Sequence, residues 1–418
     1  MKVLVIGSGG REHAVVKKLR ESKRVTELYC APGNAGIAKI ADCINIKATD
    51  IKGITEFSKA NGIDLVVVTP DDPLALGMVN ELTDAGIRAF GPVKEAAMIE
   101  SSKAFAKDLM KKYGIPTGEY RIFTDRGKAA EYLKKQTFPC VLKASGLALG
   151  KGVIIARDLE EAIKALNDMM TDKKFGASGE TVIIEEFLRG PEVTALTFTD
   201  GSTIRMMPSS QDHKRALDND KGLNTGGMGA FSPSRYYAKD IEKCCYDKIF
   251  IPTMEALNKE SRTFKGVIYF QLMLTEKGPK VIEYNARFGD PETEAILPLL
   301  ETDLLDIFEA CIDGQLDKVA IRWKKQASAT VVLASGGYPE TYQKGYEITG
   351  LDDVEAQGLV IYHMGTKTEN GKVLTNGGRV LAVTSLGDTV EDAVSKVYNN
   401  IERVHFTDMH YRKDIGRK

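Results

Sequence analysis

The first hundred residues alternate short apolar runs with helix-forming segments, and this alternation restricts the possible folds more than any other feature of the chain. Apolar runs such as KVLVIG (residues 2–7) and DLVVVTP (residues 64–70) are separated by segments with helical patterning. Strands that alternate with helices are typical of a doubly wound parallel sheet. The sequence therefore predicts an N-terminal α/β domain over residues 1–102. Its helices are expected near residues 11–22, 51–61 and 73–85.

Two glycine-containing loops follow the first two predicted strands. In the first, GSGGREHA, Gly9 and Gly10 would place backbone N–H groups and the positive end of a helix dipole against an anion. Glu12 stands where the third glycine of the G-x-G-x-x-G fingerprint belongs, so a small phosphorylated ligand is favoured over a dinucleotide. The second loop, APGNAG at residues 31–36, should lie at the same edge of the sheet. Ordinary turn formation is the alternative for either loop alone.

Residues 138–153, FPCVLKASGLALGKGV, predict a strand followed by a glycine-rich loop. Glycines let a backbone fold closely over phosphates and lysines supply positive charge, although the spacing differs from that of a P-loop. A flexible hairpin with no role in phosphate binding is the alternative. The residues suited to phosphate contact are Lys143, Gly146, Gly150, Lys151 and Gly152.

Two further segments carry polar groups that are suited to substrates. Residues 181–194 predict a strand that ends in a Glu-Glu pair and a Gly-Pro turn, which would offer backbone groups to an adenine edge and Glu192 to ribose hydroxyls. A purely structural strand and turn is preferred when this segment is considered alone. Residues 207–233 predict a long polar loop, and loops of this length are usually functional or disordered. His213 in this loop lacks a nucleophile pattern nearby, so a role in substrate positioning is favoured.

Residues 266–295 predict a hairpin that presents metal ligands. Two apolar runs flank a short turn that contains Gly278 and Pro279. Successive side chains of a strand face opposite ways. One face would therefore carry Glu283, Asn285 and Arg287, and the other Ile282, Tyr284 and Ala286.

The pairing of this hairpin decides which oxygen atoms meet. A turn centred near Lys277 places Gln271 opposite Glu283, which gathers amide and carboxylate oxygens. Such ligands suit a nucleotide-bound Mg²⁺, whereas a solvated sheet face is the alternative. After the strand, Arg287 would receive an anionic group and Asp290 an amine.

From about residue 324 the chain predicts a small antiparallel sheet with helices, which should pack on the first domain and cover the site. Its polar motif NGGR offers two alternatives for Arg379. The guanidinium would either close the site over phosphate or lie in an exposed hairpin turn.

Composition excludes several classes of protein. The net charge of −1 and dispersed basic residues argue against a nucleic-acid or membrane surface, and no apolar run reaches the length of a membrane span. The short apolar run at the N-terminus is not a signal peptide, so a cytoplasmic protein is expected. Six cysteines without CxxC spacing predict reduced thiols used in packing.

The order of these motifs resembles the glycinamide ribonucleotide synthetases, also called phosphoribosylamine–glycine ligases, of the ATP-grasp superfamily. The resemblance covers almost the whole chain. It implies an N-terminal doubly wound domain at 1–102, a two-part ATP-grasp domain at 103–323 with a lid at about 125–194, and a mixed α/β domain at 324–418. The motifs that carry it are VLVIGSGGREHA, APGNAGI, KASGLALGKGV, VIIEEFLRGPE, SQDHKRALDNDKGLNTGGMGA, VIEYNARFGDPETE, TNGGRVLAVTSLG and YRKDIG.

The resemblance implies the second step of de novo purine biosynthesis. In this reaction ATP, glycine and 5-phosphoribosylamine give glycinamide ribonucleotide, ADP and phosphate through glycyl phosphate. It implies Mg²⁺ or Mn²⁺ as the cofactor, with ATP as co-substrate. Small molecules would be the partners of a monomer or weak homodimer. A single activity is expected because the chain stops at YRKDIGRK.

The resemblance also implies roles for particular residues. Arg287, Lys143 and Asp290 would be catalytic, and Glu283, Asn285 and Gln271 would bind the metal. The ATP-binding residues would be Lys103, Lys143, Gly146, Gly150, Lys151, Gly152, Glu185, Glu186, Leu188 and Glu192. The substrate-binding residues would be Gly9, Gly10, Glu12, Asn34, Asp212, His213, Lys214, Thr225, Arg287 and Asp290.

Some positions depart from the pattern of the family, so two alternative functions stay open. One is an ATP-grasp ligase that uses another small carboxylate or amine. The other is a nucleotide-binding module without catalysis, which the joint presence of Glu283, Asn285, Arg287 and Lys143 argues against. The departures are Thr69, Ser145, Leu149, Leu217, Gln271 and Glu294.

Overall fold

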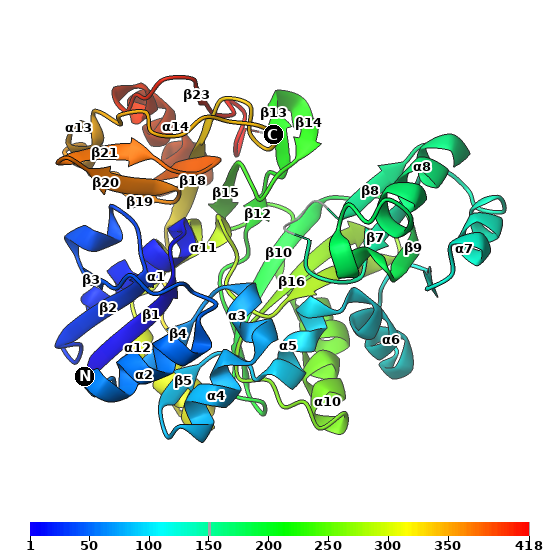
Figure 1. The fold of residues 1–418 in the computed structure, drawn as a ribbon, viewed down its shortest axis with the longest axis horizontal. Helices are drawn as coiled ribbons and strands as arrows, with labels where there is room; N and C mark the ends of the chain where they lie inside the picture. Colours follow the sequence, from blue (N-terminus) through cyan, green and yellow to red (C-terminus); the bar gives the residue numbers. More distant parts are fainter. Residues whose placement is uncertain (149–151, 418) are drawn as a thin grey trace.

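The N-terminal part of the chain forms a five-stranded parallel sheet (Figure 1). The computed structural model describes residues 1–148 and 152–417. Val3 and Val5 pack into one apolar cluster, whereas Leu4 and Ile6 pack into a second cluster on the opposite face. Burial of both faces is typical of parallel sheets, so the predicted doubly wound fold is confirmed. The strands in spatial order are β3 (Asp42–Cys43), β2 (Glu27–Pro32), β1 (Lys2–Gly7), β4 (Leu65–Val68) and β5 (Arg88–Phe90).

Helices cover both faces of this sheet. The single helix predicted near residues 73–85 is wrong, because the segment forms two helices that meet at Gly77. Gly77 has φ +94°, a left-handed conformation that glycine adopts readily and that ends the first of these helices. Packed against the face of Val3 are α1 (Gly10–Arg20) and α12 (Leu304–Asp313), and against the other face α2 (Ile51–Asn61) and α4 (Met78–Asp84), with α3 (Asp71–Leu76) before α4.

A second sheet projects from the body of the molecule at the right of Figure 1, and we call residues 120–186 the lid. Its antiparallel strands share an apolar core with α7 (Arg126–Leu133) and α8 (Leu159–Met170). The chain enters the lid from α5 (Lys94–Ser101) and α6 (Lys103–Tyr113); Ser102 caps α6 by accepting a hydrogen bond from Phe105 N at 3.2 Å. The strands in spatial order are β6 (Tyr120–Phe123), β9 (Val182–Glu186), β7 (Cys140–Ala144) and β8 (Val153–Ala156).

The central sheet contains the predicted hairpin. Gln271 of β16 lies opposite Glu283 of β17, as the sequence predicts. A bulge then inserts Ile282, so Val281 and Tyr284 both face the core while Ile282 lines the cavity described below. The expectation that Ile282 shares a face with Tyr284 is therefore wrong. The strands in spatial order are β11 (Ile204–Met206), β10 (Glu192–Thr199), β16 (Gly266–Thr275) and β17 (Gly278–Asn285). Two helices precede β16 in the chain, α9 (Lys239–Cys245) and α10 (Ile251–Lys259).

The third sheet takes strands from two distant parts of the chain. The predicted long loop at 207–233 instead contains four short strands: β15 pairs with both β12 and β18, and β13 and β14 pair with each other as a hairpin. The hairpin consists of β13 (Arg215–Leu217) and β14 (Lys221–Asn224). The sheet contains β12 (Gln211–Asp212), β15 (Gly229–Ser232), β18 (Ala327–Ser335), β22 (Arg379–Gly387) and β19 (Val360–His363), with β23 (Met409–His410) paired to β18.

The remaining elements complete the layer above the N-terminal sheet (Figure 1). Tyr362 and Met364 share an apolar cluster with β1 and α1, so the third sheet packs on the first domain as predicted. The elements are α11 (Glu292–Ile296), α13 (Leu351–Glu355), α14 (Val390–Asn400), β20 (Thr366–Glu369) and β21 (Lys372–Thr375).

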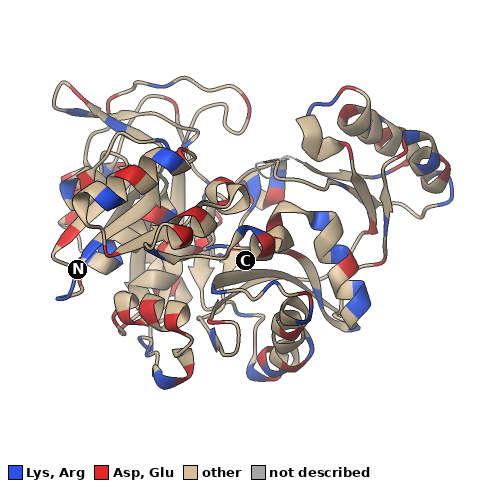
Figure 2. Cartoon of the chain, turned by 60° about the horizontal axis from the view of Figure 1, so that its bottom comes forward, with Lys and Arg blue, Asp and Glu red and all other residues tan. Residues whose placement is uncertain are grey.

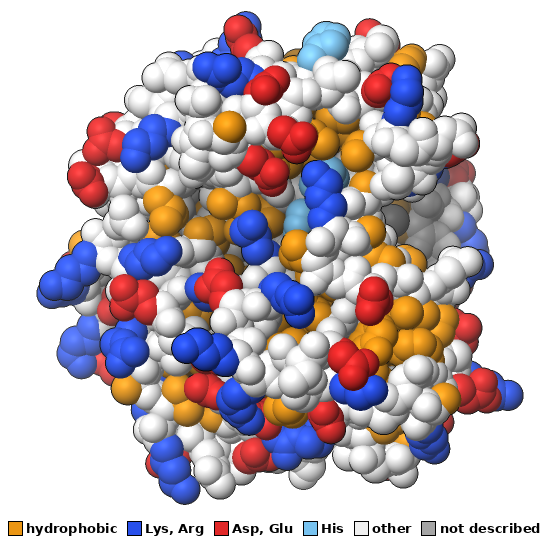
Figure 3. All heavy atoms as spheres, turned by 90° about the vertical axis from the view of Figure 1, so that its left-hand side faces the viewer, with side chains coloured by type: hydrophobic (Ala, Val, Ile, Leu, Met, Phe, Trp, Pro, Cys, Tyr) orange, Lys and Arg blue, Asp and Glu red, His pale blue; other side chains and the backbone are white. Residues whose placement is uncertain are grey.

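Charged side chains of both signs are mixed over the molecule. Figure 2 shows acidic and basic residues side by side on most helices, and Figure 3 shows the same mixture on one face. Within residues 1–148 and 152–417, no helix is both long and apolar enough to span a membrane.

Candidate active site

A cavity of about 1020 Å³ lies between the lid, the central sheet and the third sheet. This volume is sufficient for a nucleotide together with a second small ligand. Residues from the four segments predicted to bind substrates or metal, 138–153, 181–194, 207–233 and 266–295, meet there although they are far apart in sequence. The predicted site residues on its wall are Lys103, Lys143, Gly152, Glu185, Glu186, Leu188, Glu192, Asp212, His213, Lys214, Thr225, Gln271, Glu283, Asn285, Arg287 and Asp290.

Some predicted site residues do not line this cavity. Gly146 lies beside it, where its carbonyl accepts a hydrogen bond from Lys103 Nζ at 3.1 Å. Leu149, Gly150 and Lys151 lie outside the described residues, so the predicted roles of Gly150 and Lys151 in the phosphate loop stay predictions. Of the remaining residues, Gly9 and Asn34 lie in the two loops at the edge of the N-terminal sheet, and Gly10 and Glu12 lie in the first turn of α1.

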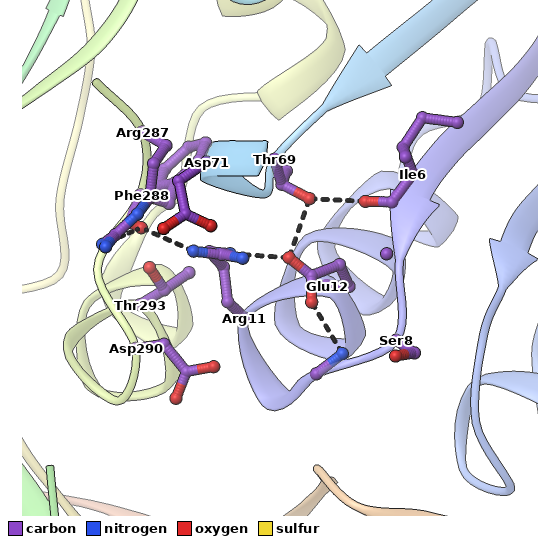
Figure 4. A network of polar contacts seen from close by, with 12 residues as sticks. Ile6, Ser8, Arg11, Glu12, Thr69, Asp71, Arg287, Phe288, Asp290 and Thr293 are labelled. Atoms are coloured by element: carbon purple, nitrogen blue, oxygen red, sulfur yellow. Dashed lines mark hydrogen bonds and ion pairs between the residues drawn. The ribbon is translucent and has the colours of Figure 1, made fainter. Parts of the chain in front are cut away.

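Glu12, which is drawn in Figure 4, and Asn34 fix those two loops through their side chains. Glu12 Oε2 accepts from Gly9 N at 2.6 Å, and its Oε1 accepts from Arg11 Nε at 2.6 Å. The Asn34 amide donates to Ser8 O at 2.9 Å and to His363 O at 2.7 Å, and its oxygen accepts from two backbone N–H groups. Both side chains therefore shape the loops. At the position of the third glycine in the dinucleotide fingerprint, the Glu12 carboxylate instead accepts a hydrogen bond from the loop backbone.

The candidate metal ligands lie together on the central hairpin. Burial raises the pKa of Glu283, but the ammonium groups of Lys214, Lys143 and Lys103 outweigh it and hold that pKa below its ordinary value. Gln271 is buried; its Nε2 donates to Glu192 Oε2 at 2.8 Å, and its Oε1 has no hydrogen-bond partner among the described residues.

The third candidate ligand is also oriented. Asn285 Oδ1 accepts from Arg287 Nη2 at 3.1 Å. No group of three or more His, Cys, Asp or Glu side chains within residues 1–148 and 152–417 is arranged to hold a metal. A site here would therefore depend on amide oxygens and on ligands from a bound nucleotide.

Two buried lysines, one from α6 and one from the lid, share one carboxylate of the lid. The ammonium groups of Lys107 and Lys143 each lie 3.1 Å from Glu185 Oε2, and Lys143 also donates to Ile282 O at 3.1 Å. Burial lowers the pKa of Lys107 to about 8 although Glu185 opposes the shift. Sequence reasoning missed Lys107; its position on the apolar face of α6, where a lysine is rarely buried unpaired, was the available signal.

Arg287 belongs to a cluster of charges that joins three elements (Figure 4). Its Nη2 lies 2.9 Å from Glu100 Oε1, and Glu100 Oε2 accepts from Ala286 N at 2.7 Å. Burial raises the pKa of Asp71, but the guanidinium groups of Arg287 and Arg11 outweigh it and lower that pKa. Sequence reasoning did not identify Glu100, Asp71 or Arg11, because tertiary packing alone brings them to the site.

Carboxylates gather on the wall opposite the lid. Glu292 Oε1 accepts from Tyr269 Oη at 2.8 Å and from Thr194 Oγ1 at 3.2 Å. Burial, followed by the nearby charge of Glu292, raises the pKa of Asp212 well above its ordinary value, and Asp212 Oδ1 has no hydrogen-bond partner among the described residues. Lys214 is also on this wall. The arrangement offers both acceptors and a cation to a small zwitterion.

Arg379 reaches this wall from the third sheet. Its Nη1 lies 2.9 Å from Asp290 Oδ1 and donates to Gly226 O at 2.8 Å. The alternative of an arginine in an exposed turn is therefore wrong, because Arg379 begins β22 and its half-buried side chain pairs with Asp290.

Comparisons with known proteins assign the three parts of the chain consistently. Models of phosphoribosylglycinamide synthetase match as the N domain at residues 1–100, the ATP-grasp (A) domain at 101–293 and the C domain at 328–418.

Individual proteins are similar over the whole chain. The phosphoribosylamine–glycine ligase of Caldanaerobacter subterraneus subsp. tengcongensis is 48% identical over 416 residues, covering 100% of this chain and 99% of the relative. That of Halalkalibacterium halodurans is 48% identical over 418 residues, covering 100% and 97%. The crystal structure of the phosphoribosylamine–glycine ligase of Thermotoga maritima superposes with a TM-score of 0.88 at 33% identity, covering 99% of this chain and 100% of the other.

Proposed function

Because the chain belongs to the phosphoribosylglycinamide synthetase family, we propose that its large cavity joins glycine to 5-phosphoribosylamine with conversion of ATP to ADP and phosphate. The observation that carries the proposal is the meeting of Lys143, Glu283, Asn285 and Arg287 on one cavity wall. The product would be glycinamide ribonucleotide, and the reaction is the second step of de novo purine biosynthesis.

The chemistry requires two transfers. A carboxylate is a poor electrophile because its oxygen is a poor leaving group, so the glycine carboxylate first attacks the γ-phosphorus of ATP and ADP leaves. The amine of phosphoribosylamine then attacks the carbonyl carbon of glycyl phosphate, and phosphate leaves as the amine loses a proton. Such transfers depend chiefly on positioning and on neutralisation of negative charge.

We assign the nucleotide to the side of the cavity beneath the lid. Lys103 and Lys143 would neutralise the phosphates, Glu185, Glu186 and Leu188 would surround the adenine edge, and Glu192 would accept from ribose hydroxyls. The support is that all six residues line the cavity, four of them between the end of strand β9 and the start of β10.

Glu283, Asn285 and Gln271 fit a divalent cation such as Mg²⁺ or Mn²⁺. The unpartnered, buried Oε1 of Gln271 lies in the strand pair directly opposite Glu283, and all three residues supply the oxygen atoms that these cations prefer. A cation held there would neutralise phosphate oxygens during transfer.

Glycine would occupy the wall formed by Asp212, Lys214 and Glu292. The cations of Arg287 and Lys214 would receive its carboxylate, and Asp212, Glu292 and Asp290 would accept hydrogen bonds from its ammonium group. The phosphate of the second substrate would meet Gly9 and Gly10 at the start of α1, a helix end that favours anions.

ADP release tests the proposal directly. The purified protein would be assayed with Mg²⁺, ATP, glycine and freshly prepared phosphoribosylamine, with each omitted in turn. ADP release that requires all three substrates, together with glycinamide ribonucleotide detected by mass spectrometry, is the expected result. No turnover with glycine while ATP still binds would contradict it and favour a ligase for another small carboxylate.

The metal requirement and the oligomeric state can be tested separately. Replacing Mg²⁺ with Mn²⁺ should preserve turnover, whereas EDTA should abolish it. Sedimentation analysis is expected to give a monomer or weak homodimer, and the protein is expected to be cytoplasmic.

A further inference from the structure

The last residues of the chain pack against the hairpin β13–β14 beside the cavity. Figure 1 places the C-terminal end next to this hairpin. Lys413 N donates to Asp218 Oδ1 at 2.8 Å, and Asn219 N donates to Asp414 Oδ2 at 2.9 Å. His410 Nε2 lies 2.8 Å from Ala216 O. The tail therefore contacts the first strand of the hairpin and the turn between its strands.

Arg412 is the centre of this contact. Its side chain is fully buried. Nε and Nη2 donate to the two carboxylate oxygens of Asp414 at 2.8 and 2.9 Å, Nη2 also donates to Asp220 Oδ1 at 2.9 Å, and Nη1 donates to Arg215 O at 3.0 Å. A buried guanidinium is tolerated only when its charge and donors are matched in this way. Arg412 thus ties the tail to the hairpin at two separate points.

The turn of the hairpin depends on outside contacts for its shape. Asn219 and Asp220 have φ values of +60° and +54°, a left-handed conformation that is uncommon outside glycine. Both residues are bonded to the C-terminal tail, Asn219 through its backbone N–H and Asp220 through its carboxylate. The tail is therefore well placed to hold the turn in this conformation.

The hairpin is continuous with the wall assigned to glycine. Asp212 ends β12, Lys214 comes directly before β13, and Thr225 comes directly after β14. Thr225 N and Thr225 Oγ1 each lie 2.8 Å from Lys214 O, to which both donate, so the two ends of the hairpin move together. A displacement of the hairpin would consequently displace Lys214 and Asp212.

We propose that Arg412 is a positioning residue for glycine: it anchors β13–β14 to the C-terminal tail and thereby fixes Asp212 and Lys214 on the cavity wall. This inference rests on the proposed function for the identity of the ligand. The anchor requires the several N–H donors of a guanidinium. A lysine ammonium group could not bond to both oxygens of Asp414, to Asp220 and to Arg215 O at the same time.

Steady-state kinetics of Arg412→Lys and Asp220→Asn test the inference. Arg412→Lys should lower kcat/KM for glycine about tenfold or more, because small misplacements of binding groups have effects of this order, while KM for ATP stays within about twofold. Asp220→Asn should lower kcat/KM for glycine by a smaller factor. This variant should fold, because the Asp220 carboxylate is largely exposed and asparagine tolerates the left-handed turn.

A matched control comes from another arginine that holds the tail. Arg235 Nη2 donates to Gly416 O at 2.9 Å but makes no contact with the hairpin among its described hydrogen bonds and ion pairs. Arg235→Met should leave kcat/KM for glycine unchanged. An equal loss in Arg235→Met, or wild-type glycine kinetics in Arg412→Lys, would overturn the inference.

His213 gives a readout that does not depend on turnover. It faces the guanidinium of Arg412, the carboxylates of Asp220 and Asp414, and the ring of Phe231. Burial first, and then the charge of Arg412, lower the pKa of His213 to about 4. In Arg412→Met, NMR titration of labelled histidine should show this pKa raised, because the two carboxylates remain.

The two readouts separate the inference from the proposed function. An unchanged His213 titration in Arg412→Met overturns the inference even if the wild-type protein ligates glycine. A raised His213 pKa in a protein whose wild type does not use glycine places the charge of Arg412 beside the hairpin and overturns the proposed substrate. Should Arg412→Met not fold, the glycine kinetics of Arg412→Lys and Asp220→Asn decide the question.

Discussion

Arg287 is held in place by Glu100, with Nη2 of the arginine 2.9 Å from Oε1 of the glutamate. The second oxygen of Glu100 accepts from Ala286 N at 2.7 Å, so one carboxylate fixes both the backbone before Arg287 and its guanidinium. Glu100→Gln should lower kcat/KM for glycine by about 10- to 100-fold, because Arg287 would lose its orientation. It should also lower the free energy of unfolding by about 1–3 kcal/mol, since a buried group loses its partner. Steady-state kinetics and urea denaturation measure the two effects.

Glu95 provides the control for this prediction. It lies on the exposed side of the same helix, α5, and bonds to Asn80 Nδ2 at 3.0 Å. Glu95→Gln should retain wild-type kinetics. If Glu100→Gln also does so, Arg287 does not need its partner.

Gln271 should contribute to metal affinity. Its Oε1 is buried without a partner among the described residues, opposite Glu283. Gln271→Met keeps a similar volume and removes this oxygen, so half-saturation of activity should need several-fold more Mg²⁺. Gln271→Gly should act in the same direction. The measurement is the rate of ADP release as a function of free Mg²⁺ at saturating ATP. Lys277→Ala, in the exposed turn of the hairpin, is the control. If both Gln271 variants give the wild-type dependence on Mg²⁺, Gln271 is not part of the metal site.

Local features such as the hairpin register could be predicted from the sequence, whereas several contacts between distant segments could not. Strand alternation and a short turn were sufficient to pair Gln271 with Glu283, because register in a hairpin is a local property. The bulge at Ile282 could not be predicted, since the same apolar residue suits either face. The pairing of β15 with β18 joins segments about a hundred residues apart, and nothing in the polar pattern of 207–233 specified a partner. Glu100 was missed for the same reason: its role exists only once α5 packs beside β17.

Lys107 should make the free energy of unfolding increase as pH rises through the alkaline range. Burial lowers its pKa to about 8 from the ordinary value of 10.5. Between these two values the unfolded chain binds more protons than the folded one, so the contribution of Lys107 to the free energy of unfolding becomes more favourable as pH rises. Relative to Lys107→Met, wild-type stability should therefore increase by up to about 3 kcal/mol from pH 8 to pH 10.5. Urea denaturation across this range measures the difference, and parallel curves for the two proteins would show that Lys107 stays charged.

Acid should weaken the contact between the first and third parts of the chain. His13 Nδ1 accepts from His363 N at 2.8 Å, a bond that joins α1 to β19 and requires an unprotonated nitrogen. Burial lowers the pKa of His13 well below 6.5, and burial also lowers the pKa of His363 to about 4. Below pH 6.5 the unfolded chain is therefore protonated at both positions while the folded chain is not. Stability should consequently fall as pH falls, with each histidine contributing about 1.4 kcal/mol per pH unit between pH 6.5 and the lowered pKa.

The contribution of His13 can be isolated by comparing proteins, because carboxylates also titrate in acid. His13→Gln removes one titrating ring, so its free energy of unfolding should fall less steeply than that of the wild type between pH 6.5 and pH 5. His405→Gln is the matched control, because His405 is exposed and its side chain makes no described contact with α1. Urea denaturation at half-unit intervals gives the three slopes. Equal slopes for wild type and His13→Gln would mean that the His13–His363 contact does not limit stability in acid.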